Sequence, residues 1–163
     1  MNQAYILLGS NQGNKVANLQ VAFEAIKSLG DIKRTSSIYE TAAWGWEEQE
    51  SFLNQVLELD TLLSPENLLR ALLKIEEEMG RKRVQKWAAR IIDIDILYVG
   101  QAIVQRENLQ IPHPYLHLRR FTLVPLCEIA TNFKHPIFGK TTQELLEECP
   151  DTLEVNLLCL KTL

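Results

Sequence analysis

Residues 91–99 read Ile-Ile-Asp-Ile-Asp-Ile-Leu-Tyr-Val, and this stretch decides the fold that we expect of the chain. The run is short and strongly apolar, which predicts a buried strand. Side chains alternate along a strand, so Asp93 and Asp95 should lie on one face, about 6–7 Å apart. Two carboxylates on one face of so apolar a strand indicate a functional site.

The segments before this strand carry alternating strand and helix patterns. Ser64, Pro65 and Glu66 are typical of a helix start, because Ser caps, Pro suits the first helical position and Glu favours the first turn. Gly30 and Gly80 each follow an apolar helical repeat and should end it. The pattern predicts strands over 4–8, 32–41, 52–62 and 91–99, and helices over 14–29 and 64–79.

This order is strand, helix, strand, strand, helix, strand. It predicts an α+β protein with a ferredoxin-like βαββαβ sheet and helices packed on one face. Two further helices are expected near 119–129 and 141–148.

Composition limits the classes of protein that fit. The 163 residues suggest one domain spanning 1–163, and 46% hydrophobic and 23% charged residues are ordinary for a globular chain. The formal net charge of −4 argues against a broad nucleic-acid surface. The N-terminus lacks the pattern of a signal peptide, and no stretch is long and apolar enough to span a membrane. We therefore expect a cytoplasmic protein without nucleic-acid or membrane partners.

Asp93 and Asp95 suggest a site for a hard divalent cation. Carboxylates close together in an apolar environment repel each other and lose hydration, and a cation with oxygen ligands resolves that conflict. The alternative is that both aspartates cap neighbouring loops or pair with arginines.

A basic segment precedes the two aspartates. Five of the eleven residues in 80–90 are basic and none is acidic. A polyphosphate with magnesium needs both carboxylates for the metal and cations for the remaining oxygens, and Arg81 and Arg90 have the fork geometry that suits phosphate. Taken alone, such a loop is slightly more typical of a solvated surface segment.

Several short motifs occur in order along the chain and resemble those of the 6-hydroxymethyl-7,8-dihydropterin pyrophosphokinase family. The similarity runs from about residue 3 to residue 130, and 81–95 is its most specific part. The motifs are Gly9-Ser10-Asn11, Phe52-Leu53-Asn54, Gly80-Arg81-x-Arg83, Trp87-x-x-Arg90-x-x-Asp93-x-Asp95-Ile96, Pro112-His113-Pro114 and Arg119-x-Phe121.

The resemblance implies an enzyme with a ferredoxin-like fold that transfers the β,γ-diphosphate of ATP to a pterin alcohol and releases AMP. It also implies two Mg²⁺ ions bound by Asp93 and Asp95. We further expect a monomer. Arg81 and Arg90 would neutralise charge during transfer. Positions that match the nucleotide site are Glu76, Arg83, Lys86, Trp87, Arg90, Ile96, His113 and Arg119, and those that match the pterin site are Thr41, Ala42, Trp44, Phe52, Asn54 and Phe121.

Two loops depart from the pattern of this family. Ala88 and Ala89 stand where Gly and Pro are usual, and Ala42 and Ala43 stand where two prolines are frequent. These changes remove backbone restraints, so loop ordering should differ from that of the family.

Two other functions remain open at this stage. A protein with the same pocket could bind the nucleotide or pterin without catalysis, or a ferredoxin-like module could bind RNA through the basic segment. The identity of a general base also stays open, because a metal-bound Asp95 would be a weak one.

Overall fold

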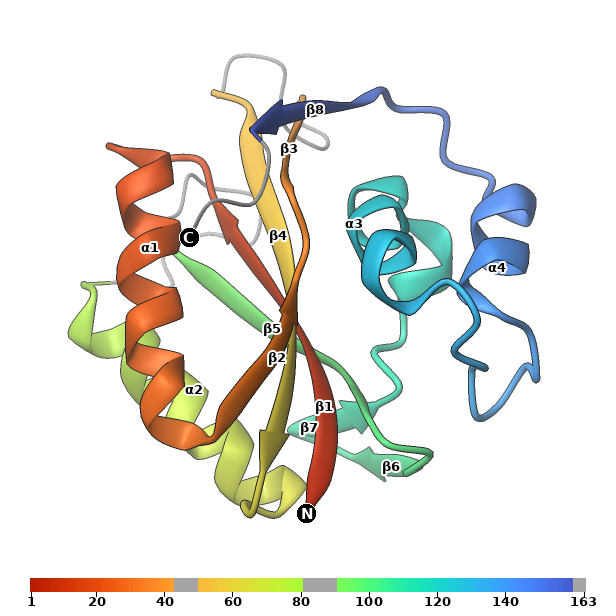
Figure 1. Ribbon diagram of the computed structural model, residues 1–163, viewed down its shortest axis with the longest axis horizontal. Helices are drawn as coiled ribbons and strands as arrows, with labels where there is room; N and C mark the ends of the chain where they lie inside the picture. Colours follow the sequence, from red (N-terminus) through yellow and green to blue (C-terminus); the bar gives the residue numbers. More distant parts are fainter. Residues whose placement is uncertain (43–49, 81–90, 160–163) are drawn as a thin grey trace.

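The computed structural model describes residues 1–42, 50–80 and 91–159. A six-stranded sheet forms the centre of the molecule, with the order β5-β1-β4-β3-β8 and β2 also paired to β4 (Figure 1). All these pairings are antiparallel. The strands of this sheet are β1 (Asn2–Ser10), β2 (Asp31–Thr35), β3 (Ile38–Thr41), β4 (Phe52–Thr61), β5 (Asp93–Val99) and β8 (Val155–Cys159).

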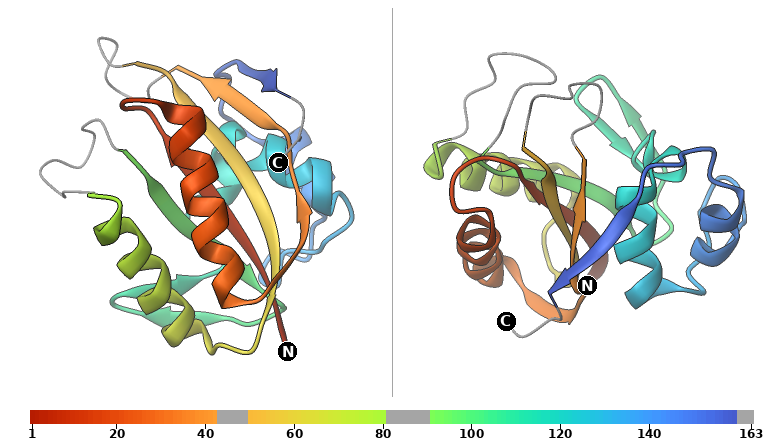
Figure 2. Two further views of the ribbon diagram at one scale, coloured as in Figure 1. Left: turned by 60° about the vertical axis from the view of Figure 1, so that its left-hand side comes forward. Right: turned by 90° about the horizontal axis from the view of Figure 1, so that it is seen from above.

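Helices cover both faces of the sheet, and Figures 1 and 2 show them on opposite sides. The expectation of helices on one face is therefore too narrow, although the ferredoxin-like α+β fold is confirmed. On one face lie α1 (Lys15–Ile26), with its 3₁₀ extension η1 (Lys27–Leu29), and α2 (Pro65–Glu78); on the other lie η2 (Leu116–Leu118), α3 (Arg120–Ala130) and α4 (Thr142–Glu148).

Alternation along β1 explains the two layers. Ala4, Ile6 and Leu8 join the core under α1 and α2, whereas Tyr5 and Leu7 join the core under α3 and α4. A strand buried on both faces reads as a continuous apolar run, which is why the sequence alone did not reveal the second layer.

The helix starts follow the expected rules. Ser64 accepts a hydrogen bond from the Asn67 N–H at the start of α2, and Asn14 caps α1 through the Ala17 N–H. Thr141 and Glu144 form a reciprocal capping box at α4. None of the helices among the described residues is long and apolar enough to cross a membrane.

The strand expected over 32–41 is wrong as one element, because it is divided into β2 and β3. Ser36 exchanges hydrogen bonds with the Val56 backbone through its own N–H and Oγ. The next N–H, of Ser37, donates to Glu128 of α3 instead of to a strand. Strand pairing is therefore interrupted at these two serines.

Two further elements lay outside the sequence expectation. A short hairpin comprises β6 (Val104–Arg106) and β7 (Leu109–Ile111), and β8 pairs with β3 at one end of the sheet. At the opposite edge of the sheet, β5 begins at Asp93, whereas the sequence predicted a start at Ile91. The β6–β7 hairpin contacts β5, and so it lies at the edge of the sheet that β5 forms.

Candidate active site

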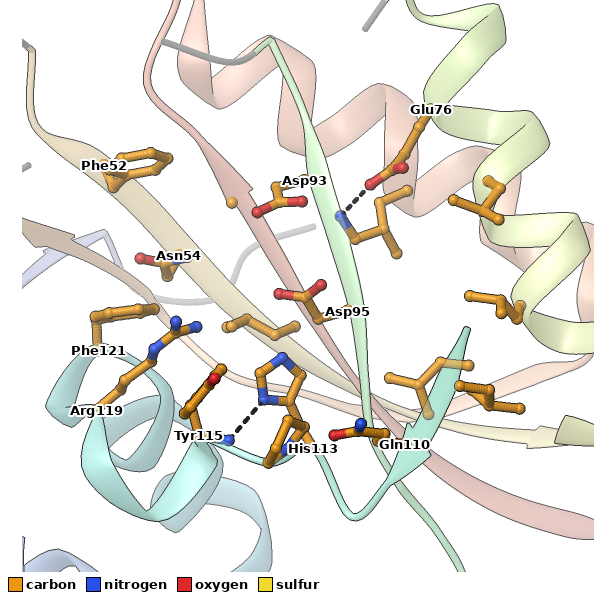
Figure 3. A pocket seen from close by; sticks show the side chains of 18 of the residues that line it. Phe52, Asn54, Glu76, Asp93, Asp95, Gln110, His113, Tyr115, Arg119 and Phe121 are labelled. Atoms are coloured by element: carbon orange, nitrogen blue, oxygen red, sulfur yellow. Dashed lines mark hydrogen bonds between the residues drawn. The ribbon is translucent and has the colours of Figure 1, made fainter. Parts of the chain in front are cut away.

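A cavity of about 460 Å³ opens beside β5, on the face of the sheet that carries α3. Its floor is built from neighbouring strands, with Asn54 of β4, Gly9 of β1 and Asp93 of β5 in one register row. The α2 helix, the β6–β7 hairpin and the first turn of α3 add walls around this floor. Figure 3 shows these side chains converging from elements far apart in sequence.

Eleven of the residues singled out from the sequence line this one cavity. They come from α2, α3, β3, β4, β5 and the loops that adjoin them. They are Thr41, Ala42, Phe52, Asn54, Glu76, Asp93, Asp95, Ile96, His113, Arg119 and Phe121.

The other expected site residues lie outside the described part of the chain. These are Trp44, Arg81, Arg83, Lys86, Trp87 and Arg90. The geometry reported below concerns the described residues alone.

Asp93 and Asp95 are half-buried and occupy alternate positions on β5. The strand partners of Asp93 and Asp95 on β1 are Gly9 and Leu7, and both of these also line the cavity. Ile94, which lies between the two aspartates, points into the core on the opposite face of the sheet. The expected sharing of one face by the two carboxylates is therefore confirmed.

Glu76 of α2 supports β5 from its outer side. Its Oε2 accepts a hydrogen bond from the Ile94 N–H at 2.7 Å, and the residue is only 3% exposed. Because β5 ends the sheet, this contact satisfies a strand N–H that no neighbouring strand can reach. Glu76 thus fixes the strand that carries both aspartates (Figure 3).

His113 presents a neutral ring to the cavity. Burial lowers the pKa of His113 to about 4, with a further decrease from the nearby Arg119 cation and an opposing effect of Asp93. The Tyr115 N–H donates to His113 Nδ1 at 3.1 Å, so the neutral ring carries its proton on Nε2. Figure 3 shows this second nitrogen turned toward Asp95, where it can donate to an anionic ligand.

Arg119 lies between two aromatic rings at the start of α3. Its guanidinium carbon is 5.1 Å from the centroid of Tyr115 and 5.5 Å from that of Phe121. Stacking of this kind restrains a long cationic side chain without neutralising it. The cavity therefore contains a held cation across from the carboxylates of β5 (Figure 3).

Unpaired polar atoms mark the other end of the cavity. Asn54 Oδ1 and Thr41 Oγ1 are buried and have no hydrogen-bond partner within the described residues. Asn54 Nδ2 donates to the Leu8 carbonyl at 3.2 Å, which fixes the amide with its oxygen available. Buried polar atoms without partners are costly, so this end is suited to a ligand with a polar edge.

Sequence reasoning missed the contribution of the hairpin and of Tyr115. Gln110 and Leu109 of β7 line the cavity, as do Leu69 and Leu73 of α2. The alternation of Val104, Leu109 and Ile111 around Glu107-Asn108 was an available hairpin signal, but each strand is only three residues long.

The fold and the cavity together define a ferredoxin-like protein with a small-molecule site at the edge of its sheet. Solved structures agree on the fold. Plasmodium falciparum HPPK-DHPS superimposes with a TM-score of 0.75 at 21% identity, covering 91% of this chain and 43% of that one. At this identity the likeness establishes the fold alone.

Sequence relatives identify the family. The family described as 7,8-dihydro-6-hydroxymethylpterin-pyrophosphokinase (HPPK) matches residues 5–131. The 2-amino-4-hydroxy-6-hydroxymethyldihydropteridine pyrophosphokinase of Haemophilus influenzae is 43% identical over 159 residues, covering 96% of this chain and 99% of the relative. The Aquifex aeolicus enzyme of the same name is 41% identical over 148 residues, covering 91% and 92%.

The chain therefore belongs to the 7,8-dihydro-6-hydroxymethylpterin-pyrophosphokinase family. Enzymes of this family transfer a pyrophosphoryl group from ATP to hydroxymethyldihydropterin in folate biosynthesis, so the expected reaction and enzyme class are confirmed. In some relatives the homologous region is part of a longer protein, and this chain spans 23% of the Dictyostelium discoideum folic acid synthesis protein.

Proposed function

We propose that the cavity beside β5 is the small-molecule site for this reaction, within one pyrophosphokinase domain spanning residues 1–163. The β,γ-diphosphate of ATP is transferred to the hydroxyl of 6-hydroxymethyl-7,8-dihydropterin, and AMP is released. One observation carries the proposal: paired carboxylates, a held cation, a neutral histidine donor, and amide and hydroxyl oxygens without a partner among the described residues line the same 460 Å³ space.

We assign the pterin to the end of the cavity formed by β3, β4 and α3. Asn54 Oδ1 and Thr41 Oγ1 offer buried polar atoms to the polar edge of the ring. Phe121 supplies an aromatic face for stacking, and Phe52 and Ala42 complete the walls.

We assign the nucleotide to the end formed by α2, β5 and the β6–β7 hairpin. Leu69, Leu73 and Ile96 give an apolar surface for a purine ring, and Gln110 lies at its rim. Glu76 acts here by holding β5 through the Ile94 N–H. Arg83, Lys86 and Trp87 are proposed to add contacts to the nucleotide on the strength of the family resemblance.

Asp93 and Asp95 fit a magnesium site that is completed by the substrate. The described residues contain no cluster of three or more His, Cys, Asp or Glu side chains able to hold a metal alone. Mg²⁺ is commonly bound by one or two carboxylates together with phosphate oxygens and water, which is the donor set that β5 offers. Asp93 and Asp95 would hold two Mg²⁺ ions, and these would supply positive charge to stabilise the negative charge that develops during transfer.

The residues of the chain contribute mainly by orientation and charge. His113 Nε2–H and the Arg119 guanidinium are proposed to bind phosphate oxygens, which their orientation by Tyr115 supports. Arg81 and Arg90 are proposed to neutralise the diphosphate as it moves. Asn54 and Phe121 would hold the pterin so that its hydroxyl faces the β-phosphorus in line. Asp95 is a candidate to accept the proton of the pterin hydroxyl, although a carboxylate that also held Mg²⁺ would be a weak base.

We further propose a monomer that acts in the cytoplasm. The eleven expected site residues that the structure describes meet in one cavity, so the proposed reaction requires no residue from a second copy. The use of ATP as co-substrate supports a cytoplasmic location.

Incubation of the protein with ATP, Mg²⁺ and the pterin alcohol tests the proposal, with chromatographic detection of AMP. AMP should form only when the pterin is present, and Asn54→Ala should raise the KM for pterin without changing that for ATP. Binding of both ligands without AMP would favour a binding protein, and tight magnesium-independent RNA binding in a gel shift would favour an RNA-binding module.

A further inference from the structure

Two separate elements form the walls of the proposed pterin end. Thr41 is the last residue of β3, Ala42 follows it, and Phe121 lies in the first turn of α3. The spacing between these walls therefore depends on what holds α3 against β3.

Glu128, in the last turn of α3, makes one such connection. Its carboxylate accepts hydrogen bonds from the Ser37 N–H at 3.1 Å, from Ser37 Oγ at 3.2 Å and from Tyr39 Oη at 2.6 Å. Tyr39 pairs directly with Asn54 across the sheet. One carboxylate thus joins the end of α3 to the strand beside the residue proposed to read the pterin edge.

A second connection lies at the other end of α3. The Arg120 N–H donates to Asp151 Oδ2 at 3.0 Å, and Arg120 Nε donates to the Leu153 carbonyl at 3.1 Å. The chain then continues into β8, where Val155 pairs with Thr41. This segment runs directly from the first turn of α3 to the β3 residue that lines the cavity.

Neither Glu128 nor Asp151 lines the cavity itself. The purine surface of the nucleotide end is built on other elements, namely α2, β5 and the β6–β7 hairpin, and β5 is held separately by Glu76. From α3, only its N-cap residue Arg119 is proposed to bind the nucleotide, through the phosphates. Loss of either connection should therefore affect the two ends of the cavity differently.

We infer that Glu128 and Asp151 are positioning residues that hold α3 against β3 and so set the spacing of the pterin walls. The inference rests on the proposed assignment of the pterin end. Glu128 acts through Ser37 and Tyr39, and Asp151 acts through Arg120 and the chain leading to β8. A displacement of a binding group by an ångström is enough to change a rate or affinity by one to two orders of magnitude.

Steady-state kinetics of Glu128→Gln provide the first test, because the amide keeps the size of the side chain and loses its charge. The KM for pterin should rise about tenfold, whereas the KM for ATP should stay within about twofold. Glu147→Gln is the matched control. Within the described part of the chain, the Glu147 carboxylate accepts a hydrogen bond only from Gln143 of the same helix, α4. This variant should leave both constants unchanged.

Two further variants guard against a folding defect. Tyr39→Phe removes one hydrogen bond of the Glu128 connection, and Asp151→Asn weakens the connection at Arg120. Each should raise the KM for pterin by about threefold with little effect on ATP. Urea unfolding verifies that each variant is folded under the assay conditions.

The inference is overturned if the folded variants change both KM values by the same factor, or change neither. The proposed site assignment is judged separately by Asn54→Ala. If that variant leaves the pterin KM unchanged, the assignment of the pterin end fails; if it raises the KM while the Glu128 and Asp151 variants do not, only the positioning role fails.

Discussion

Gly9 lies in β1 between Asn54 of β4 and Asp93 of β5, at the centre of the cavity floor. A Cβ atom added here would lie 2.8 Å from Asn54 Nδ2, where ordinary van der Waals contact begins at 3.4 Å. Gly9→Ala should therefore displace the Asn54 amide by at least half an ångström (~0.6 Å), because that amide is the nearest group. Its hydrogen bond to the Leu8 carbonyl, at 3.2 Å, would be stretched or broken.

The expected cost is that of one misplaced buried hydrogen bond to the pterin, about 1–3 kcal/mol. This corresponds to a pterin Kd raised about 5- to 150-fold. Isothermal titration of the pterin alcohol, with Mg²⁺ and a non-hydrolysable ATP analogue present, measures this change. Affinity for the analogue alone should be unaffected, because the three atoms nearest to the added Cβ belong to Asn54 and Leu53 of β4.

A double-mutant cycle determines whether the effect acts through Asn54. In an Asn54→Ala background, the next atom near the new Cβ is the Leu53 carbonyl oxygen at 3.9 Å, so Gly9→Ala should cost little. An equal loss of pterin affinity in both backgrounds, or no loss in the presence of Asn54, would refute this account of the cavity floor.

Three other substitutions test separate parts of the site and fold. Asp95→Asn keeps the size of the side chain and removes its charge, so turnover measured by AMP formation should fall by roughly a hundredfold or more while far-UV circular dichroism is unchanged; near-normal turnover would exclude Asp95 as a metal ligand. Phe121→Leu should raise the pterin Kd about tenfold through the lost ring face, with ATP affinity unchanged, and similar losses for both ligands would contradict the stacking role. Burial, followed by the effect of His117, lowers the pKa of His135 to about 4, below its unfolded value of 6.5. The neutral form is therefore favoured by folding, so this stability is complete above pH 6.5 and is lost as the pH falls toward 4. Between pH 7.5 and 5.0 the free energy of unfolding should decrease by at most about 2 kcal/mol. His135→Asn should not show this decrease, and its Oδ1 can still accept hydrogen bonds from the Ile137 and Phe138 N–H groups. Urea unfolding at the two pH values compares the proteins, and an identical pH dependence would show that His135 does not titrate as expected.

The sequence predicted the parts of the fold that have strong local patterns. The apolar run at 91–99, the Ser64 cap and the helical repeats gave the βαββαβ order, which is found with its second strand divided into β2 and β3. The break at Ser36 and Ser37 was not predictable, because it depends on Glu128, which is distant in sequence. The weak alternation of β8 gave no local indication that it would pair with β3.

The site was predictable to a similar degree. Strand alternation alone placed Asp93 and Asp95 on one face, and the family resemblance supplied the distant partners that share the cavity. Periodicity could not indicate that Tyr115 would orient His113 or that Glu76 would hold the edge of β5. Those contacts arise from tertiary packing between elements that no local pattern connects.

The pairing of β8 with β3 also has a consequence for how the protein folds. Ile38 pairs with Cys159, more than a hundred residues later in the chain. Contacts of such high sequence separation form late and slowly, because loop closure must precede them. Until β8 arrives, β3 is an open edge strand, and such edges promote association between chains. We therefore expect the central strands to form before the pterin wall, and refolding at high protein concentration to be most prone to aggregation in that interval.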